Sequence, residues 1–210
     1  AKVVIVEKCE EGKAGGNTKV CGQLFAYANG DKDAAKSYYT ALAGGRDIEP
    51  EIIDAISEGV ANMADILADE FGFNKDEYMD WTGVNVGGTN MGAMSPEYPE
   101  MPGHEKMALW TTHAGASDGY LYQGLKQNVT DRVDAIDVWY SSPAKSLIQD
   151  PVTKTVVGVT VERDGKEMNI RALNGVCICT GGFECNKEMV QHYLNVINYA
   201  PVSYTHLRAH

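Results

Sequence analysis

The chain has 210 residues, of which 44% are hydrophobic and 22% charged, and its formal net charge is −11 at pH 7. This composition is typical of a globular chain, and no apolar run approaches the length that spans a bilayer. The negative charge argues against nucleic acids and anionic membrane surfaces as partners. Neither is therefore expected as a partner; the sequence motifs indicate a small-molecule substrate instead.

The first predicted element is a β-branched strand, Val3–Val6, which is followed directly by Glu7. An apolar strand that ends in a carboxylate is typical of the second strand of a dinucleotide-binding βαβ unit, where the acid binds ribose hydroxyls. The loop Gly15–Thr18 then combines two glycines, which permit positive φ or close backbone approach, with two polar side chains. The alternative is an ordinary buried strand followed by a solvated Glu-Lys pair. On the first interpretation, the unit's first strand and its Gly-x-Gly-x-x-Gly turn are expected to precede residue 1.

Two helices are predicted next, at Asp33–Ala43 and from Pro50 to Gly72. The second has apolar residues at spacings of three and four over about 20 residues. Residues 83–103 are rich in Gly, Pro and Met and predict a long loop, either functional or a surface excursion. His104 and His113 border this loop and are interpreted as polar loop residues rather than proton donors.

The second half of the chain predicts a helix followed by an antiparallel group of strands. Leucine and valine at every fourth position predict a helix over Asp118–Arg132. The turns between the strands are Asp150-Pro151 and Asp164-Gly165, and Asp-Gly is a strong hairpin signal. The expected strands are Ile136–Tyr140, Lys145–Gln149, Val156–Arg163 and Glu167–Ala172.

Near the C-terminus, a short apolar strand is predicted at Val176–Cys179, ending in the small-residue turn Thr180–Phe183, and a helix at Asn186–Leu194. In doubly wound sheets, ligands lie beyond the carboxyl ends of strands, where small residues allow contact with the backbone. Cys177 and Cys179 share one face of the expected strand. They are either a metal or redox pair or, as we favour, small hydrophobic residues in a packed strand. An odd number of cysteines without a Cys-x-x-Cys pair favours a reducing compartment such as the cytoplasm.

These motifs resemble a known family. The segments EKCEEGKAGGNTKVCGQ and VTVERDGKEMNIRALNGVCICTGGFECNKEMVQHYL are similar to the flavoproteins of the fumarate reductase/succinate dehydrogenase type, which include soluble fumarate reductases, urocanate reductases and ketosteroid dehydrogenases. The resemblance implies an α/β fold: a Rossmann-like FAD-binding domain of the glutathione-reductase type with an inserted antiparallel β-meander, incomplete in this chain. It also implies FAD as cofactor, held non-covalently because the loop lacks the histidine that tethers flavin in succinate dehydrogenases.

The resemblance assigns cofactor contacts residue by residue. Glu7 would bind the adenosine ribose, and the backbone of Ala144 would meet the adenine edge. The pyrophosphate and flavin would be lined by Gly15, Gly16, Asn17 and Thr18. The isoalloxazine ring would lie near Gly22 and Gln23. The ribose and pyrophosphate would lie beside the C-terminal turn, Thr180, Gly181 and Gly182. This chain reads Cys21–Leu24 where relatives often have Ala-x-Gly-Gly, so the flavin contacts of this segment differ.

The expected organisation is an FAD-binding domain at 1–190, the start of a substrate cap at 191–200, and a non-native tail at 201–210, which resembles translated vector sequence. The alternative for the tail is a genuine polar loop. In relatives the catalytic acid and the carboxylate-binding residues lie beyond the equivalent of residue 200. We therefore assign no catalytic residue and no metal ligand.

The expected activity is a flavin-dependent hydride transfer between FAD and a carbon–carbon bond next to a carbonyl or carboxylate, as in fumarate or enoate reductases. The alternatives are a ketosteroid-type dehydrogenase and a nucleotide-binding module without turnover. The electron donor or acceptor is unknown from the sequence. The 210-residue chain by itself is expected to be inactive and to bind FAD poorly.

Overall fold

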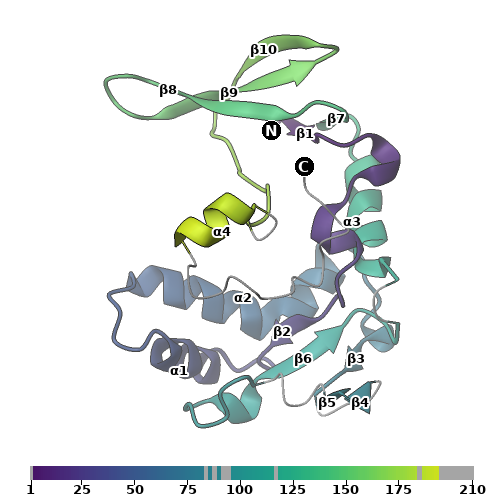
Figure 1. Ribbon diagram of the computed structural model, residues 1–210. Helices are drawn as coiled ribbons and strands as arrows, with labels where there is room; N and C mark the ends of the chain where they lie inside the picture. The colour runs from purple at the N-terminus through teal and green to yellow at the C-terminus, as the bar shows by residue number, and fades with distance from the viewer. Residues whose placement is uncertain are drawn as a thin grey trace. The chain divides into compact units, whose positions relative to one another are not determined.

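A computed structural model describes residues 2–82, 85–86, 89–90, 96–115, 118–183 and 186–193 (Figure 1). The chain divides into two compact units: a terminal unit, residues 1–17 with 129–210, and a central unit, residues 18–128. Both units contain strands and helices, so the mixed α/β class is confirmed. The predicted tail, 201–210, lies outside the described residues, and the predicted domain boundaries stay a prediction.

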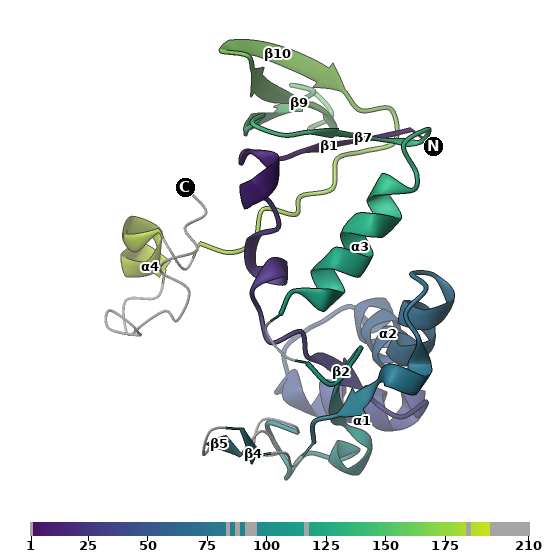
Figure 2. The same cartoon turned by 90° about the vertical axis from the view of Figure 1, so that its right-hand side faces the viewer.

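In the terminal unit, strand β1 (Val3–Val6) pairs in parallel with β7 (Ile136–Trp139), with Val3 opposite Ile136 and Val6 opposite Trp139. Figure 2 shows the two strands side by side. The β-branched residues of β1 favour the extended conformation of a strand. Successive strand side chains point to opposite faces, yet Val3, Val4 and Ile5 are all 37–46% exposed. Both faces of β1 therefore have little cover, and among the described residues β7 is the only strand paired along its edges.

The remaining strands of this unit form the expected antiparallel meander, in the order β10-β9-β8. Its strands are β8 (Ala144–Gln149), β9 (Val156–Arg163) and β10 (Lys166–Arg171). Asp164 and Gly165 connect β9 to β10 with φ of +52° and +70°, which is the type I′ geometry that Asp-Gly favours. The expectation that residues 136–140 belong to the antiparallel group is wrong. β7 is reached from β1 through a long crossover, and such a connection permits the parallel pairing that a tight hairpin does not.

Gly158 lies in β9 directly opposite Arg171 of β10. A Cβ at this position would overlap the carbonyl oxygen of Ile170, which is backbone and has little freedom to move aside. We expect Gly158→Ala to lower the free energy of unfolding by about 1–3 kcal/mol, measured by urea denaturation. Gly59→Ala is the control, because a Cβ at Gly59, within a helix, meets nothing within 4 Å and should stabilise that helix. An unchanged urea midpoint for Gly158→Ala would contradict the expectation.

The central unit contains a small antiparallel sheet, in the order β2-β6-β3, and two long helices. Its strands are β2 (Phe25–Tyr27), β3 (Met79–Asp80) and β6 (Ala108–Thr111), and the helices are α1 (Lys32–Leu42) and α2 (Pro50–Asp69). Helix α3 (Tyr120–Thr130) follows. The predicted loop at 83–103 also contains a short antiparallel pair, β4 (Asn85–Val86) with β5 (Thr89–Asn90), so it is not wholly irregular.

The helix boundaries follow local signals in the sequence. The Asp31 side chain accepts a hydrogen bond from the Ala34 N–H at 2.9 Å and thereby caps α1. Pro50 occupies the first turn of α2, where a missing N–H has no consequence. Gly72, with φ of +77°, ends the helix in the left-handed conformation that favours glycine. The first three of the four predicted helices, here α1, α2 and α3, are confirmed with boundary shifts of a few residues.

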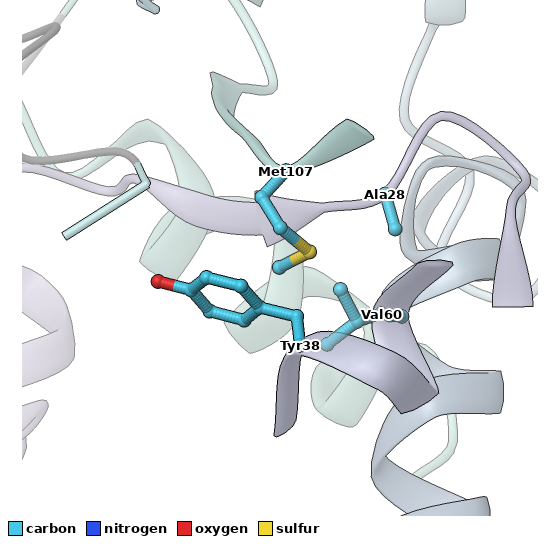
Figure 3. Close-up of a cluster of buried hydrophobic side chains, with 5 residues drawn as sticks. Ala28, Tyr38, Val60 and Met107 are labelled. Atoms are coloured by element: carbon cyan, nitrogen blue, oxygen red, sulfur yellow. The ribbon is translucent and has the colours of Figure 1, made fainter. Parts of the chain in front are cut away.

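The hydrophobic core of the central unit joins α1, α2 and the ends of two strands (Figure 3). Tyr38 of α1 and Val60 of α2 pack with Met107, which precedes β6, and Ala28, which follows β2. The N–H of Ala28 also donates to the carbonyl of Val60 at 3.2 Å. These contacts anchor β2 to the helices. They also fix the chain that immediately precedes β2, which includes Gly22 and Gln23.

Residues 172–183 have no regular structure, and the short helix α4 (Lys187–Tyr193) confirms the helix expected at 186–194. The strand predicted at Val176–Cys179 is wrong: this segment forms no strand and is largely exposed. An apolar strand needs a neighbour to accept its backbone hydrogen bonds, and no described strand pairs with it. Among the described residues, no helix is both long enough and apolar enough to cross a membrane.

Candidate functional site

Glu7 lies at the carboxyl end of β1, and the sequence predicts that its side chain binds a ribose. Its side-chain Oε1 accepts the N–H of Cys9 at 2.8 Å, and its own N–H donates to the Trp139 carbonyl at 2.9 Å. A carboxylate accepts up to about four hydrogen bonds. The bond to Cys9 therefore orients the side chain and still leaves acceptor sites for two ribose hydroxyls.

The chain after β1 and the chain after β7 are joined by backbone hydrogen bonds. The Ser142 N–H donates to the Glu7 carbonyl at 2.8 Å, and the Ser141 N–H donates to the Cys9 carbonyl at 2.9 Å. Ser142 is fully buried, and Ala144 begins β8 two residues further on. The structure thus brings Glu7 close to the segment of Ala144, as a site for ribose and the adjoining adenine requires.

The glycines of the Gly15–Thr18 loop adopt the backbone conformations that only glycine takes readily. Gly15 and Gly16 have φ of +119° and +50°, and residues 16–19 form a short 3₁₀ turn. No neighbouring atom lies within 4 Å of a Cβ built on Gly16. Gly16, Asn17 and Thr18 are exposed, so a ligand can approach this backbone. Of these residues, Thr18 belongs to the central unit and the others to the terminal unit.

The C-terminal turn does not follow the strand that the sequence predicts, and its contacts with a nucleotide stay a prediction. Thr180, Gly181 and Gly182 are exposed and follow a segment that is not a strand, although Gly181 does have a left-handed φ of +74°. Within the described part of the chain, these three residues make no hydrogen bond to Glu7. The structure therefore groups Glu7 with the Ala144 segment but does not join the Thr180–Gly182 turn to them by hydrogen bonds.

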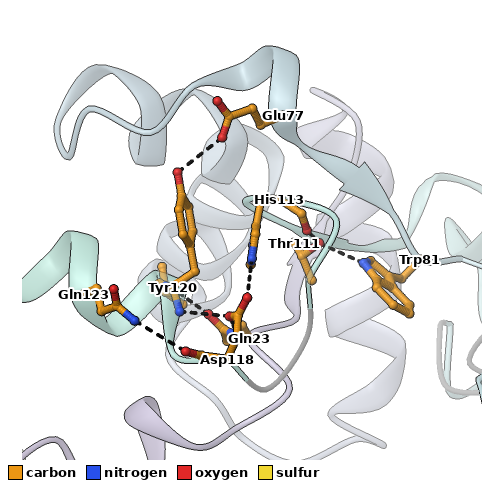
Figure 4. Close-up of polar contacts among 9 residues, drawn as sticks. Gln23, Glu77, Trp81, Thr111, His113, Asp118, Tyr120 and Gln123 are labelled. Carbon is orange, nitrogen blue, oxygen red and sulfur yellow. Dashed lines mark hydrogen bonds and ion pairs between the residues drawn. The ribbon is translucent and has the colours of Figure 1, made fainter.

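Gln23 is almost completely buried in the central unit, at 1% exposure, and has a strained φ of +61°. Its Nε2 donates to Asp118 Oδ1 at 2.7 Å, and its Oε1 accepts the Leu121 N–H at 2.7 Å (Figure 4). Both ends of the amide are thus used to hold the start of α3. Any contact with a flavin ring would come from the backbone of Gln23 rather than from its side chain. Gly22, next to it, is half-buried.

Asp118 connects Gln23 to an imidazole. His113 Nε2 and Asp118 Oδ2 are 2.6 Å apart, and the His113 ring stacks on Tyr120 with centroids 4.1 Å apart. The Tyr120 hydroxyl in turn donates to Glu77 Oε2 at 3.2 Å. A carboxylate partner favours the proton on Nε2, so this pair can hold a proton at that atom. His113 is a polar loop residue, as the sequence indicated, and it also belongs to an ordered network that the sequence did not reveal.

The pKa of Asp118 is lowered to about 2, first by the hydrogen bond from Gln23, then by the Tyr120 N–H and by His113. A carboxyl whose pKa falls on folding stabilises the native state above its unfolded pKa, near 4, and this contribution is lost as the pH falls toward the folded value. The side chain is 48% exposed, so solvent screening weakens the effect.

We therefore expect Asp118→Asn to destabilise the protein at neutral pH and to lose this disadvantage in acid. Urea denaturation at a series of pH values should show the difference between the two proteins shrinking between about pH 4 and pH 2. Asp33→Asn, at an exposed position in the first turn of α1, is the control. A difference for Asp118→Asn that is independent of pH would contradict the assignment.

Several buried polar atoms near this network have no partner among the described residues: Trp110 Nε1, Thr112 Oγ1 and His113 Nδ1. The hydroxyl of Thr111, by contrast, accepts the Trp81 indole N–H at 2.8 Å and donates to the His113 carbonyl. Within the described ranges, no group of three or more His, Cys, Asp or Glu side chains is arranged to hold a metal ion.

Sequence reasoning identified Gln23 only as a flavin neighbour and missed the network around it. The Gln23–Asp118 bond joins residues 95 positions apart, and no local pattern signals such a pair. One local signal was present for Asp118: its Oδ1 accepts the Tyr120 N–H at 3.0 Å, a bond that an Asp-Gly pair before a helix commonly makes.

The sequence is similar to a known protein family and to one characterised dehydrogenase. Residues 1–207 match the family model described as FAD binding domain. A 60-residue segment is 47% identical to 3-oxosteroid 1-dehydrogenase of Comamonas testosteroni and covers 29% of this chain and 10% of that protein.

Two solved structures are similar in fold. The 3-ketosteroid Δ1-dehydrogenase of Sterolibacterium denitrificans, in complex with 1,4-androstadiene-3,17-dione, superposes with a TM-score of 0.70 at 17% identity, over 91% of this chain and 45% of that one. The 3-ketosteroid-Δ4-(5α)-dehydrogenase of Rhodococcus jostii RHA1, in complex with 4-androstene-3,17-dione, gives 0.64 at 20% identity, over 90% and 43%. This chain thus spans less than half the length of either structure.

Proposed function

Because the chain belongs to the FAD binding domain family, whose cofactor is FAD, we propose that it forms part of an FAD-dependent oxidoreductase. The proposed reaction transfers a hydride between a non-covalently held FAD and a carbon–carbon bond next to a carbonyl or carboxylate. When bound, the flavin supplies the hydride-transfer chemistry, and the protein supplies binding and orientation.

The observation that carries the proposal is the position of Glu7. Glu7 directly follows a strand that is paired in parallel, and its backbone carbonyl accepts the N–H of Ser142, two residues before Ala144. In α/β folds, nucleotides bind beyond the carboxyl ends of parallel strands, where an acid receives the ribose hydroxyls. Glu7 is the residue that would hold the ribose, and the Ala144 backbone would meet the adenine.

The glycine loop supports the same proposal. Gly15 and Gly16 expose backbone that a larger residue could adopt only with strain, and a pyrophosphate can approach such backbone closely. The chain is strongly acidic, so backbone donors rather than a positive surface would have to neutralise this anion. Asn17 and Thr18 add polar side chains next to it.

Two substrate classes remain in the proposal, and both present a carbon–carbon bond beside a carbonyl carbon. The first is an unsaturated acid, to which reduced flavin would deliver hydride. The second is a 3-ketosteroid, from which oxidised flavin would accept hydride. The second class is favoured because a 60-residue segment is similar in sequence to a steroid dehydrogenase. The fold, which is similar to those of two ketosteroid dehydrogenases, is consistent with the same class. We assign no catalytic residue within this chain to either reaction.

An experiment with FAD and both substrate classes tests the proposal. The chain is mixed with FAD, and binding is followed by the change in flavin fluorescence. Because the 210-residue chain by itself is expected to be inactive, a single turnover is recorded without oxygen on a longer protein that contains this chain and the rest of the fold of its structural relatives. In that protein, 4-androstene-3,17-dione is added to oxidised flavin, and fumarate is added to photoreduced flavin. Bleaching by the steroid supports dehydrogenation, and reoxidation by fumarate supports reduction. A chain that shows no FAD binding at any concentration would overturn the proposal.

A further inference from the structure

Two cysteines have their sulfur atoms in contact in the exposed segment between β10 and α4. The Sγ atoms of Cys177 and Cys179 are 3.6 Å apart, and both residues are exposed. The sequence favoured a packed strand here, in which these side chains would be small hydrophobic residues. Because residues 176–179 form no strand, the two sulfur atoms are instead open to small molecules.

Metal binding is a weak explanation for this pair. A structural zinc site takes four ligands, commonly cysteine and histidine. In the part of the chain that the structure describes, no third Cys, His, Asp or Glu side chain joins these two sulfur atoms in a group that could hold an ion. Two thiols alone, already in contact, are better suited to reaction with each other.

The backbone allows the small contraction that a disulfide between them requires. Residues two apart in a fully extended chain have Cα atoms about 6.6–7.2 Å apart, and a disulfide accommodates up to about 6.8 Å. The segment must therefore bend slightly. Gly175 and Gly181 flank it with φ of +130° and +74°, and no neighbouring atom lies within 4 Å of a Cβ built on either. The chain thus has flexible residues and free space on both sides.

We propose that Cys177 and Cys179 form a redox-active dithiol, which small-molecule disulfides such as oxidised glutathione convert into an intrachain disulfide. This modification site is independent of the proposed cofactor and substrate. Cys179 immediately precedes Thr180. A change in the oxidation state of the cysteine pair therefore occurs directly beside the turn that is expected to meet the nucleotide.

The reaction is a pair of thiol–disulfide exchanges. The Cys177 thiolate attacks one sulfur of the small disulfide, whose S–S bond breaks, and one small thiol leaves with a proton. The Cys179 thiolate then attacks Sγ of Cys177, forms the intrachain bond and releases the second small thiol with the second proton. Two protein thiols are oxidised, and one small disulfide is reduced to two thiols.

The hydrogen bond and the charge of Cys177 raise the pKa of Cys179 above that of an ordinary thiol. The order of the two attacks can also be reversed, because both residues are exposed and their sulfur atoms are already in contact.

Thiol counting on the folded 210-residue chain tests this proposal. The chain is incubated with oxidised glutathione, its remaining thiols are alkylated under denaturing conditions, and the intact mass is measured. The expected product carries two fewer labels than the reduced chain and no glutathione, and peptide mapping links Cys177 to Cys179. Reduction with dithiothreitol should restore all five labels.

Serine variants separate this pair from the other cysteines. Cys179→Ser should stop at a stable adduct of one glutathione on Cys177, because the resolving thiol is absent. Cys9→Ser, Cys21→Ser and Cys185→Ser should each still lose two thiols without retaining glutathione. A different linked pair in the peptide map, or a glutathione adduct that persists on Cys177 of the unmodified chain, would overturn the proposal.

Discussion

Replacing Glu7 with alanine is expected to raise the dissociation constant for FAD by about ten- to a hundredfold. A hydrogen bond to a charged group contributes about 1.5–3 kcal/mol, and the ribose would lose its carboxylate acceptor. The effect is a ratio of two dissociation constants, so the FAD concentrations must span both of them. The change in flavin fluorescence during titration with FAD is a suitable readout.

Two controls distinguish this role from general damage near β1. Glu10→Ala removes a carboxylate three residues away, whose partner in the structure is the exposed Lys13, and should leave FAD affinity unchanged. Glu7→Gln keeps an acceptor oxygen and should have a smaller effect than Glu7→Ala. Equal affinities for the original chain and for Glu7→Ala would refute the ribose assignment.

Replacing Gln23 with leucine is expected to have the largest effect on stability in the central unit. Leucine is of similar size, but it leaves Asp118 Oδ1 without its side-chain donor and the Leu121 N–H without its acceptor. An unsatisfied polar group costs about 1–3 kcal/mol, more when it is charged. We expect the free energy of unfolding to fall by about 2–4 kcal/mol, measured by urea denaturation.

The same variant has a second, electrostatic readout. The Gln23 hydrogen bond is the largest cause of the low pKa of Asp118, so the pKa should rise toward its ordinary value in Gln23→Leu. NMR titration of the Asp118 carboxyl checks this. The matched control is Gln123→Leu, since Gln123 is exposed and makes only a long bond, 3.4 Å, to the Asp118 carbonyl. If both variants behave alike, Gln23 is not the residue that holds this network.

The fold predicted from the sequence was correct where the signal is local. The Asp164-Gly165 turn formed as expected because both residues tolerate positive φ, and α2 began at Pro50 because proline suits a first turn. The strand expected at Val176–Cys179 failed for a different reason. Apolar residues predict only that a segment can join a sheet, whereas a strand forms when another strand pairs with it.

For the site, the sequence by itself determined which chemical groups are present: a carboxylate after a strand at Glu7, and glycines at Gly15 and Gly16 that permit a left-handed backbone. Local composition sets conformational preference, and these signals depend on adjacent residues alone. Only the tertiary structure decided that β7 pairs with β1 and places Ser142 against Glu7, and that Asp118 joins Gln23 to His113. Except for the His113–Asp118 pair, which is five positions apart, these contacts join residues about a hundred or more positions apart. Their energies arise from packing and burial rather than from local pattern.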